Sequence, residues 1–134
     1  MAETLVPVDV EVEAIAELKA RMPALGFPGF GYGTRLSAGD HIRVNAMGGV
    51  TRDLVTDRPT IRLEVFSASE GTAQRACAFA VAALQAAGRD GRIGDAVCYG
   101  VDVAALPQNL PHPQVPDRFR FFATLTASLR RATA

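Results

Sequence analysis

Three glycines recur at every second position in the stretch GFPGFGYGTR, at Gly29, Gly31 and Gly33, and glycine-rich loops can bind phosphate through backbone N–H groups. A phosphate loop of that kind follows a strand and leads into the N-terminus of a helix, where the helix dipole attracts the anion. Here the order is reversed, because a predicted helix precedes the loop and a predicted strand follows it. We therefore interpret the glycines as positions of close backbone approach at a strand edge, with Phe30 and Tyr32 packing inward or across a subunit contact.

The side chains most often found in catalytic and metal sites are few and far apart. His41 and His112 are the two histidines, and no His-x-x-x-His or Cys-x-x-Cys pair suggests a metal site, so we interpret both as solvated or hydrogen-bonded surface residues. Cys77 falls on the apolar stripe of a predicted helix, where burial disfavours the reactive thiolate. Asp53 and Asp57 lack the dense oxygen-ligand spacing of a calcium loop. The sequence therefore predicts no catalytic residue, no metal and no cofactor.

The composition is that of a globular protein with a single domain, residues 1–134. Hydrophobic residues make up 49% of the chain, and 14 basic side chains balance 14 acidic ones. A nucleic-acid-binding protein needs a basic excess to replace counterions along the phosphate backbone, so this balance disfavours that class. Cys77 and Cys98 lie among apolar residues and are too few for a disulfide framework, so we expect buried free thiols.

The N-terminus and the hydropathy pattern predict a protein that is made and folded in a cytoplasm. Glu3, Asp9, Glu11 and Glu13 stand where a signal peptide would carry basic residues before an apolar run. No uncharged apolar run approaches the ~18 residues that a membrane span requires. We therefore expect no membrane among the partners of this chain.

Apolar residues spaced by three or four positions predict two amphipathic helices. The first covers about residues 8–25, and Asp9 is a suitable N-cap for it. The second is rich in alanine over residues 73–87 and is closed by Gly88. Small side chains on its inner face would let this helix lie close to a sheet.

Alternation of apolar and polar residues predicts a largely antiparallel or mixed sheet of four to five strands, so the fold class is α+β, with both helices on one face. The double glycine Gly48–Gly49 allows a turn with positive φ and predicts a protruding hairpin from Gly49 to Pro59. Four prolines within Leu106–Pro116 exclude a helix or a central strand, so we expect an extended segment there, the proline arm. The strands are expected near residues 42–46, 61–65, 97–103 and 119–129.

The predicted sheet face away from the helices mixes apolar and polar side chains. Phe66 and Phe122 lie there among threonines and arginines, a mixture typical of a surface buried against another subunit. Arg118, Arg120 and Arg130 alternate on the same face, where they could contact phosphate or pair with acids across an interface.

The order of these segments resembles the tail terminator proteins of long-tailed, siphovirus-like bacteriophages. In that family a strand ending in a double glycine leads to a Val-Thr-Asp-x-Pro segment. A strand with an aromatic end, an alanine-rich helix, a proline-bearing loop and a final aromatic strand follow. The similarity covers most of the chain, from about the first helix to Arg130. The matching positions are Gly48, Gly49, Val55, Thr56, Asp57, Pro59, Phe66, Leu110, Pro111, Pro113 and Phe119.

The resemblance implies a structural virion protein that is not an enzyme. Tail terminators assemble as rings, usually hexamers, on the head-proximal end of the tail tube, where they end tube polymerisation and provide the head-joining surface. The implied partners are further copies of this chain, the tail tube protein and a head-completion or connector protein. Genomic DNA would pass through the lumen without specific binding. The implied location is the tail-neck region of the virion, after assembly in the cytoplasm of a bacterial host.

Candidate contacts in such a ring, or with the tube below it, follow from the polar hairpin and the proline arm, because a stiff loop loses less entropy when it docks. Two alternatives stay open. One is a head-completion or neck connector protein of the same fold, and the other is a small ligand-binding α+β domain with Phe27–Tyr32 as a pocket wall. The candidate interface residues are Gly48, Gly49, Arg52, Asp53, Asp57, Arg58, Leu110, Pro111 and Pro113.

Overall fold

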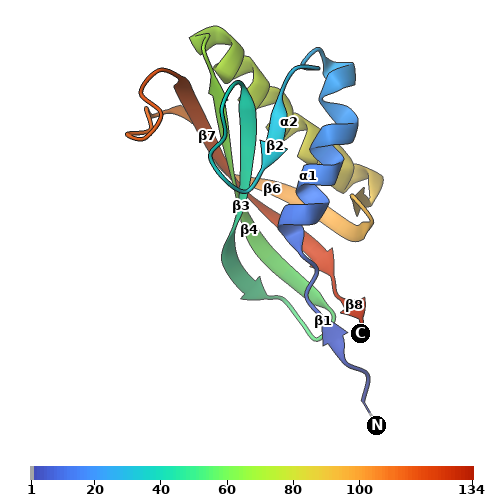
Figure 1. The fold of residues 1–134 in the computed structure, drawn as a ribbon. Helices are drawn as coiled ribbons and strands as arrows, with labels where there is room; N and C mark the ends of the chain where they lie inside the picture. Colours follow the sequence, from blue (N-terminus) through green and yellow to red (C-terminus); the bar gives the residue numbers. More distant parts are fainter. Residues whose placement is uncertain (1) are drawn as a thin grey trace.

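The computed structural model describes residues 2–134 and confirms the α+β fold. Helices α1 (Val10–Arg21) and α2 (Glu70–Asp90) pack on the same face of a six-stranded sheet, and a short 3₁₀ helix, η1 (Pro23–Leu25), follows α1 (Figure 1). The strands are β1 (Leu5–Val6), β2 (Gly31–Gly33), β3 (His41–Thr51), β4 (Thr56–Ser67), β5 (Arg92–Ile93), β6 (Ala96–Asn109), β7 (Phe119–Arg130) and β8 (Ala132–Thr133).

The main sheet has the strand order β2-β3-β4-β7-β6-β5, and a separate two-stranded sheet pairs β1 with β8. Neighbouring strands of the main sheet are antiparallel, except that β2 lies parallel to β3. The four long strands are the ones that the alternating pattern predicts. The additional strands are two or three residues long, which is too short for alternation to reveal.

The hydrophobic core lies between the helices and the inward-facing residues of β3, β4 and β7. The register places Ile42 opposite Val65 and Leu63 opposite Ala123, so alternate residues of three strands gather on the helix-facing side. All four side chains are buried, as is Ala80 of α2, whose small size lets the helix lie close to the sheet.

The helix boundaries confirm one prediction and correct another. Asp9 caps α1, because its carboxylate accepts two hydrogen bonds from N–H groups of the first turn, at 3.1 and 3.2 Å. Gly88, however, does not end α2, which continues to Asp90 and is capped by Gly91 with φ of 88°. A Cβ at Gly88 would lie 2.8 Å from the backbone nitrogen of Val101. Gly88 therefore allows close contact between α2 and β6 rather than closing the helix.

Strand β6 departs from the predicted alternation and is longer than predicted. An irregular register just after Cys98 leaves Cys98 and Val101 buried while Tyr99 is exposed. The strand also continues to Asn109 and thus includes the first proline of the proline arm, Pro107. Beyond its short pairing with β5, β6 forms the edge of the sheet, where a proline removes no ladder hydrogen bond.

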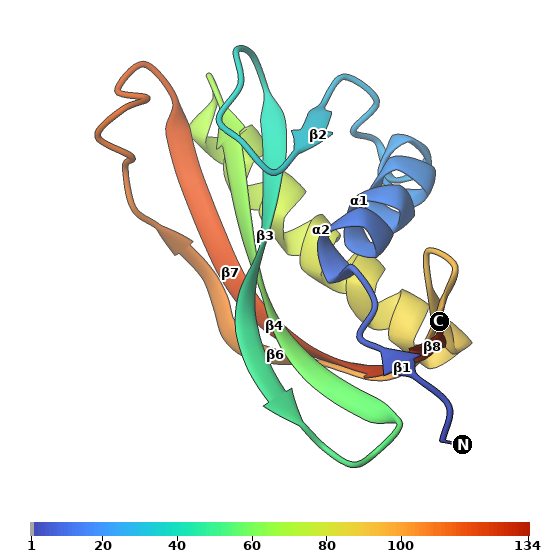
Figure 2. The same ribbon diagram turned by 60° about the horizontal axis from the view of Figure 1, so that its bottom comes forward.

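The predicted hairpin and the proline arm lie at opposite ends of the molecule. Figure 2 shows the β3–β4 hairpin near the end that carries both chain termini, whereas the loop between β6 and β7 lies at the far end of the curved sheet. The sheet therefore holds the two predicted contact regions well apart.

Candidate assembly surfaces

The protruding hairpin is formed by β3 and β4 and extends beyond the ends of both helices (Figure 2). Its turn is not at the double glycine, as predicted, but at Arg52–Val55. Gly48 and Gly49 have the expected positive φ, of 80° and 137°, yet they lie inside β3 where the register shifts between Ala46 and Gly49. The double glycine is therefore a β-bulge, which bends and twists the hairpin.

Gly49 is the more constrained of the two glycines. A Cβ at this position would lie 2.3 Å from the carbonyl oxygen of Arg58 and 2.7 Å from Cα of Pro59, on the paired strand. A Cβ at Gly48 would meet nothing within 4 Å. Close approach of β3 to β4 thus requires glycine at position 49, and this contact sets the direction of the hairpin.

The turn at the hairpin tip is held by Asp53. Its Oδ1 accepts hydrogen bonds from the N–H groups of Val55 and Thr56, both at 2.9 Å, and the N–H of Arg52 donates to the carbonyl of Thr56 at 2.9 Å. The hydrogen bond from Val55 is the main reason that the pKa of Asp53 is lowered. This compact turn leaves Leu54 projecting into solvent, with 89% of its surface exposed.

The charged residues at the base of the hairpin contact other parts of the same chain. Asp57 pairs with Arg131 through contacts of 2.9 to 3.1 Å, and the Arg131 N–H donates to the carbonyl of Val55 at 2.7 Å. Arg58 lies 3.3 Å from Asp102 of β6. Of the four charged residues predicted to contact a neighbour, Asp57 and Arg58 are ion-paired within residues 2–134, whereas Arg52 and Asp53 are not.

The proline arm is fixed to the sheet at its beginning. The N–H of Leu110 donates to the carbonyl of Arg120 at 3.1 Å, and Nη1 of Arg120 donates to the carbonyl of Leu110 at 3.4 Å. His112 meets the buried ring of Phe66 edge-on, with 6.0 Å between ring centroids. The arm thus folds against the helix-free face, and the side chain of Leu110 stays exposed. The candidate residues of this loop are Leu110, Pro111 and Pro113.

Both ends of the molecule also carry exposed apolar side chains, which the sequence did not lead us to include among the candidate contact residues. Val50 joins Leu54 on the hairpin with 68% of its surface exposed, and Leu106 near the end of β6 is 73% exposed. The sequence pattern that could have revealed the exposure of Leu54 is an apolar residue directly after two charged residues in a short turn. We therefore add Val50, Leu54 and Leu106 to the candidate contact residues.

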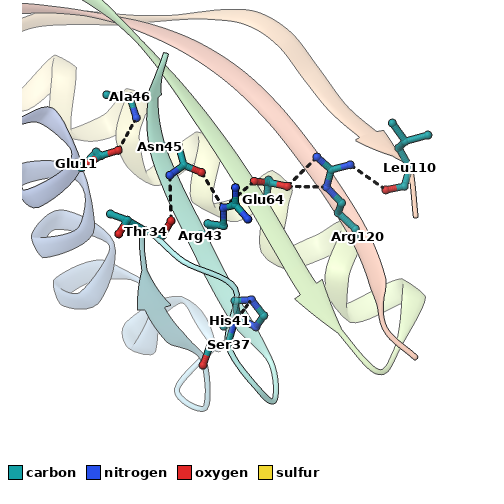
Figure 3. A network of polar contacts seen from close by, with 10 residues as sticks. All are labelled: Glu11, Thr34, Ser37, His41, Arg43, Asn45, Ala46, Glu64, Leu110 and Arg120. Carbon is teal, nitrogen blue, oxygen red and sulfur yellow. Dashed lines mark hydrogen bonds and ion pairs between the residues drawn. The ribbon is translucent and has the colours of Figure 1, made fainter. Parts of the chain in front are cut away.

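The helix-free face of the sheet carries a buried ionic network (Figure 3). Glu64 on β4 is 1% exposed, and its Oε2 accepts a hydrogen bond from Nε of Arg120 at 2.8 Å. Its Oε1 lies 3.2 Å from Nε of Arg43, which donates its hydrogen bond to Oδ1 of Asn45 at 2.8 Å. Three neighbouring strands are thus joined by a buried carboxylate and two arginines, of which Arg120 is 10% exposed and Arg43 25% exposed.

The ion pairs correct the interpretation of two arginines, Arg118 just before β7 and Arg120 within it. Arg120 needs no acidic partner from another subunit, because it already forms an ion pair with Glu64 of the same chain. Arg118 likewise pairs with Asp40, at 2.7 Å. The sequence could not reveal these pairs, because they depend on the register between strands that are distant along the chain.

His41 is a packing residue rather than the surface histidine that was predicted. Its ring is 2% exposed and stacks on Phe66, with 4.6 Å between ring centroids. Nδ1 lies 2.9 Å from the carbonyl of Gly39, and Nε2 accepts from the N–H of Ser37 at 3.3 Å. Both ring nitrogens therefore have partners in the loop before β3.

The glycine-rich stretch forms β2 and the loop before it, but close backbone approach does not explain its glycines. A Cβ at Gly31 would lie 3.7 Å from the Cβ of His41, which is ordinary contact, so the predicted reason was wrong. Phe30 and Tyr32 do pack inward against the core, which was one of the two arrangements that we expected for them. Phe27 is buried against Phe30 and Phe79, with ring centroids 6.0 and 5.4 Å apart, and Tyr32 packs against the core.

The thiols occupy the core, as predicted. Cys77 and Cys98 are both buried, and burial raises the pKa of Cys77 to about 12. Within residues 2–134, no group of three or more His, Cys, Asp or Glu side chains is placed to hold a metal ion. None of the helices in the described part of the chain is both long and apolar enough to cross a membrane.

No protein-family profile and no curated protein matches the sequence. The structure, in contrast, is similar to that of a protein chain in the virion of a native gene transfer agent (GTA) particle. The TM-score is 0.63 at 16% sequence identity, and the match covers 92% of this chain and 97% of that chain. At this level of identity the likeness establishes a shared fold.

Proposed function

We propose that this chain is a structural protein of a phage-like virion and that it caps the head-proximal end of a tail tube as a ring. The observation that carries the proposal is the similarity to a chain of a gene transfer agent virion over nearly the full length of both chains. Among virion proteins, the order of motifs from the double glycine to the final aromatic strand favours a tail terminator.

A ring requires two different contact surfaces on each subunit, because one patch must meet another patch on the next copy. The molecule offers different surfaces at its two ends. One end carries the hairpin with Leu54 and Val50, and the other carries Leu106 and the proline arm. This arrangement supports head-to-tail association of identical copies, and the resemblance to tail terminators favours a hexamer.

The proposed partners follow from the position of such a ring. One of its surfaces meets the tail tube protein and the other meets a head-completion or connector protein, in the tail-neck region of the virion. Genomic DNA passes through the lumen without specific binding, which agrees with the balanced charge of the chain. The proposal requires no enzymatic step.

The test is negative-stain microscopy of lysates in which the gene is deleted and then restored. Overlong, headless tubes that disappear on restoration are the result expected for a terminator. Tails of normal length beside full, unattached heads would instead identify a head-completion protein. Unaltered particles would contradict the virion assignment and favour the ligand-binding alternative.

A further inference from the structure

An apolar groove lies at the surface between α1 and α2. It has a volume of about 510 Å³, and its rim carries Arg21 and Arg89. Leu25 and Phe79 leave about two fifths of their surfaces exposed in it, at 40% and 37%. The remaining lining residues are all alanines, whose small side chains leave room between Leu25 and Phe79: Ala20, Ala24, Ala82, Ala83 and Ala86.

We propose that this groove receives the hairpin tip of a second copy of the chain, with Leu54 as the inserted side chain. The inference rests on the proposed function, because it requires copies that assemble next to one another. Leu54 is the most exposed large apolar side chain among the described residues, and the groove offers it an apolar surface. Removing both from water would stabilise the contact.

The two surfaces lie too far apart to meet within one molecule. Figure 1 shows the C-terminal turn of α1, which lines the groove, at the opposite end of the molecule from the turn between β3 and β4. A tip in a groove elsewhere on an identical molecule is a heterologous contact, which propagates from copy to copy until a ring closes. The pairing is therefore of the kind that the proposed ring needs.

The charges beside the two surfaces are complementary. The tip presents Arg52 and Asp53 next to Leu54, and the groove is lined by Arg21 and Arg89, with Asp90 following Arg89 in the sequence. In such a contact Asp53 can face Arg89 and Arg52 can face Asp90, so that opposite charges meet beside the leucine. Asp90 already pairs with Arg21 at 2.7 Å, but its side chain is still largely exposed and can accept a second cation.

Disulfide crosslinking tests the contact directly. A chain with Leu54→Cys and Ala86→Cys is supplied to cells that lack the natural gene, and the assembled tails are oxidised with copper phenanthroline. Copies with the tip in the neighbouring groove then form disulfide-linked ladders on a non-reducing gel. The matched control combines Leu54→Cys with Ala68→Cys, at an exposed alanine outside the groove. Burial raises the pKa of both natural thiols, Cys77 and Cys98, so neither competes in the oxidation.

Ladders from the groove pair, and monomers from the control pair, are the expected result. Capped tails that yield no ladder from the groove pair, or a crosslink to the tube protein instead, would overturn the proposal. If the cysteine pair blocks assembly, Ala86→Trp decides, because a side chain that fills the groove should abolish capping whereas Ala68→Trp should not. If both tryptophan variants cap tails, the groove is not the contact, although the proposed function could still be correct. If tails are normal without any copy of the gene, the proposed function itself is wrong.

Discussion

At the scale of single residues, Gly49 determines the path of the hairpin, because its positive φ and the paired strand both exclude a side chain. We expect Gly49→Ala to lower the free energy of unfolding by about 3 kcal/mol, through backbone strain and the clash with Arg58 and Pro59. Gly48→Ala is the matched control, since Gly48 has positive φ but open space, and should cost about 1 kcal/mol. Urea denaturation followed by circular dichroism measures both. Equal losses of unfolding free energy in the two variants would show that the close contact of Gly49 with β4 does not contribute to stability.

The ionic network gives a second prediction at this scale. Arg120→Met removes the main partner of a buried carboxylate and should lower the free energy of unfolding by about 3–5 kcal/mol. The double variant Arg120→Met with Glu64→Leu removes the buried carboxylate together with its main partner and should recover most of that loss, because the one charge left in the network, Arg43, is a quarter exposed and keeps its hydrogen bond to Asn45. Urea unfolding of the two variants measures the difference. A double variant less stable than the single one would contradict this description of the network.

Burial of Cys77 predicts that the free energy of unfolding falls at alkaline pH. Its pKa rises from 9.0 to about 12 in the folded chain, so the folded state holds the thiol proton more tightly than the unfolded state does. The stabilisation is complete below pH 9.0 and is lost as the pH rises toward about 12. A thiol-specific chromophoric disulfide reagent near neutral pH should therefore react with this thiol only after unfolding. Rapid reaction in the native protein would contradict burial of the thiol.

At the scale of elements, the hairpin separates residues that hold the fold from residues available for contacts. Arg52→Glu should leave the free energy of unfolding unchanged within about 0.5 kcal/mol, because Arg52 lies at an exposed tip. The same change should abolish tail capping if the hairpin is an assembly contact. Asp57→Asn is the contrasting variant, since loss of the partner of Arg131 should destabilise the fold. Normal infectious particles from Arg52→Glu would show that the hairpin tip is not an assembly contact.

The elements that the sequence predicted correctly are those with a signal inside the element itself. The cap at Asp9, the alanine-rich helix and the long alternating strands all have such local patterns. Gly88 and the double glycine were misinterpreted because glycine serves both turns and close backbone contacts, and the contact that each one makes depends on how the strands pair in the complete fold. Strands of two or three residues gave no pattern. Of the candidate site, the sequence predicted the hairpin and the arm, but not the exposed leucine or the groove, because exposure depends on the complete fold.

At the scale of the whole molecule, the curved sheet keeps two unlike ends apart, and this separation is what a subunit of a closed ring requires. Each end exposes a large apolar side chain, Leu54 at one end and Leu106 at the other, and these are the residues that we expect to be covered in the proposed ring. The helices leave one sheet face uncovered, and there the charges are mostly neutralised within the chain. The contacts between copies are therefore expected at the ends and at the groove between the helices, rather than across the ionic network.

The central claim is a location, a ring of this chain at the junction of tail tube and head. Immunogold labelling of purified particles with antibodies against the chain, viewed by electron microscopy, tests that location most directly. We expect label at one place on each particle, at the head-proximal end of the tail, and at one end of free tails. Label spread along the tube, or on the head of tailless particles, would contradict it.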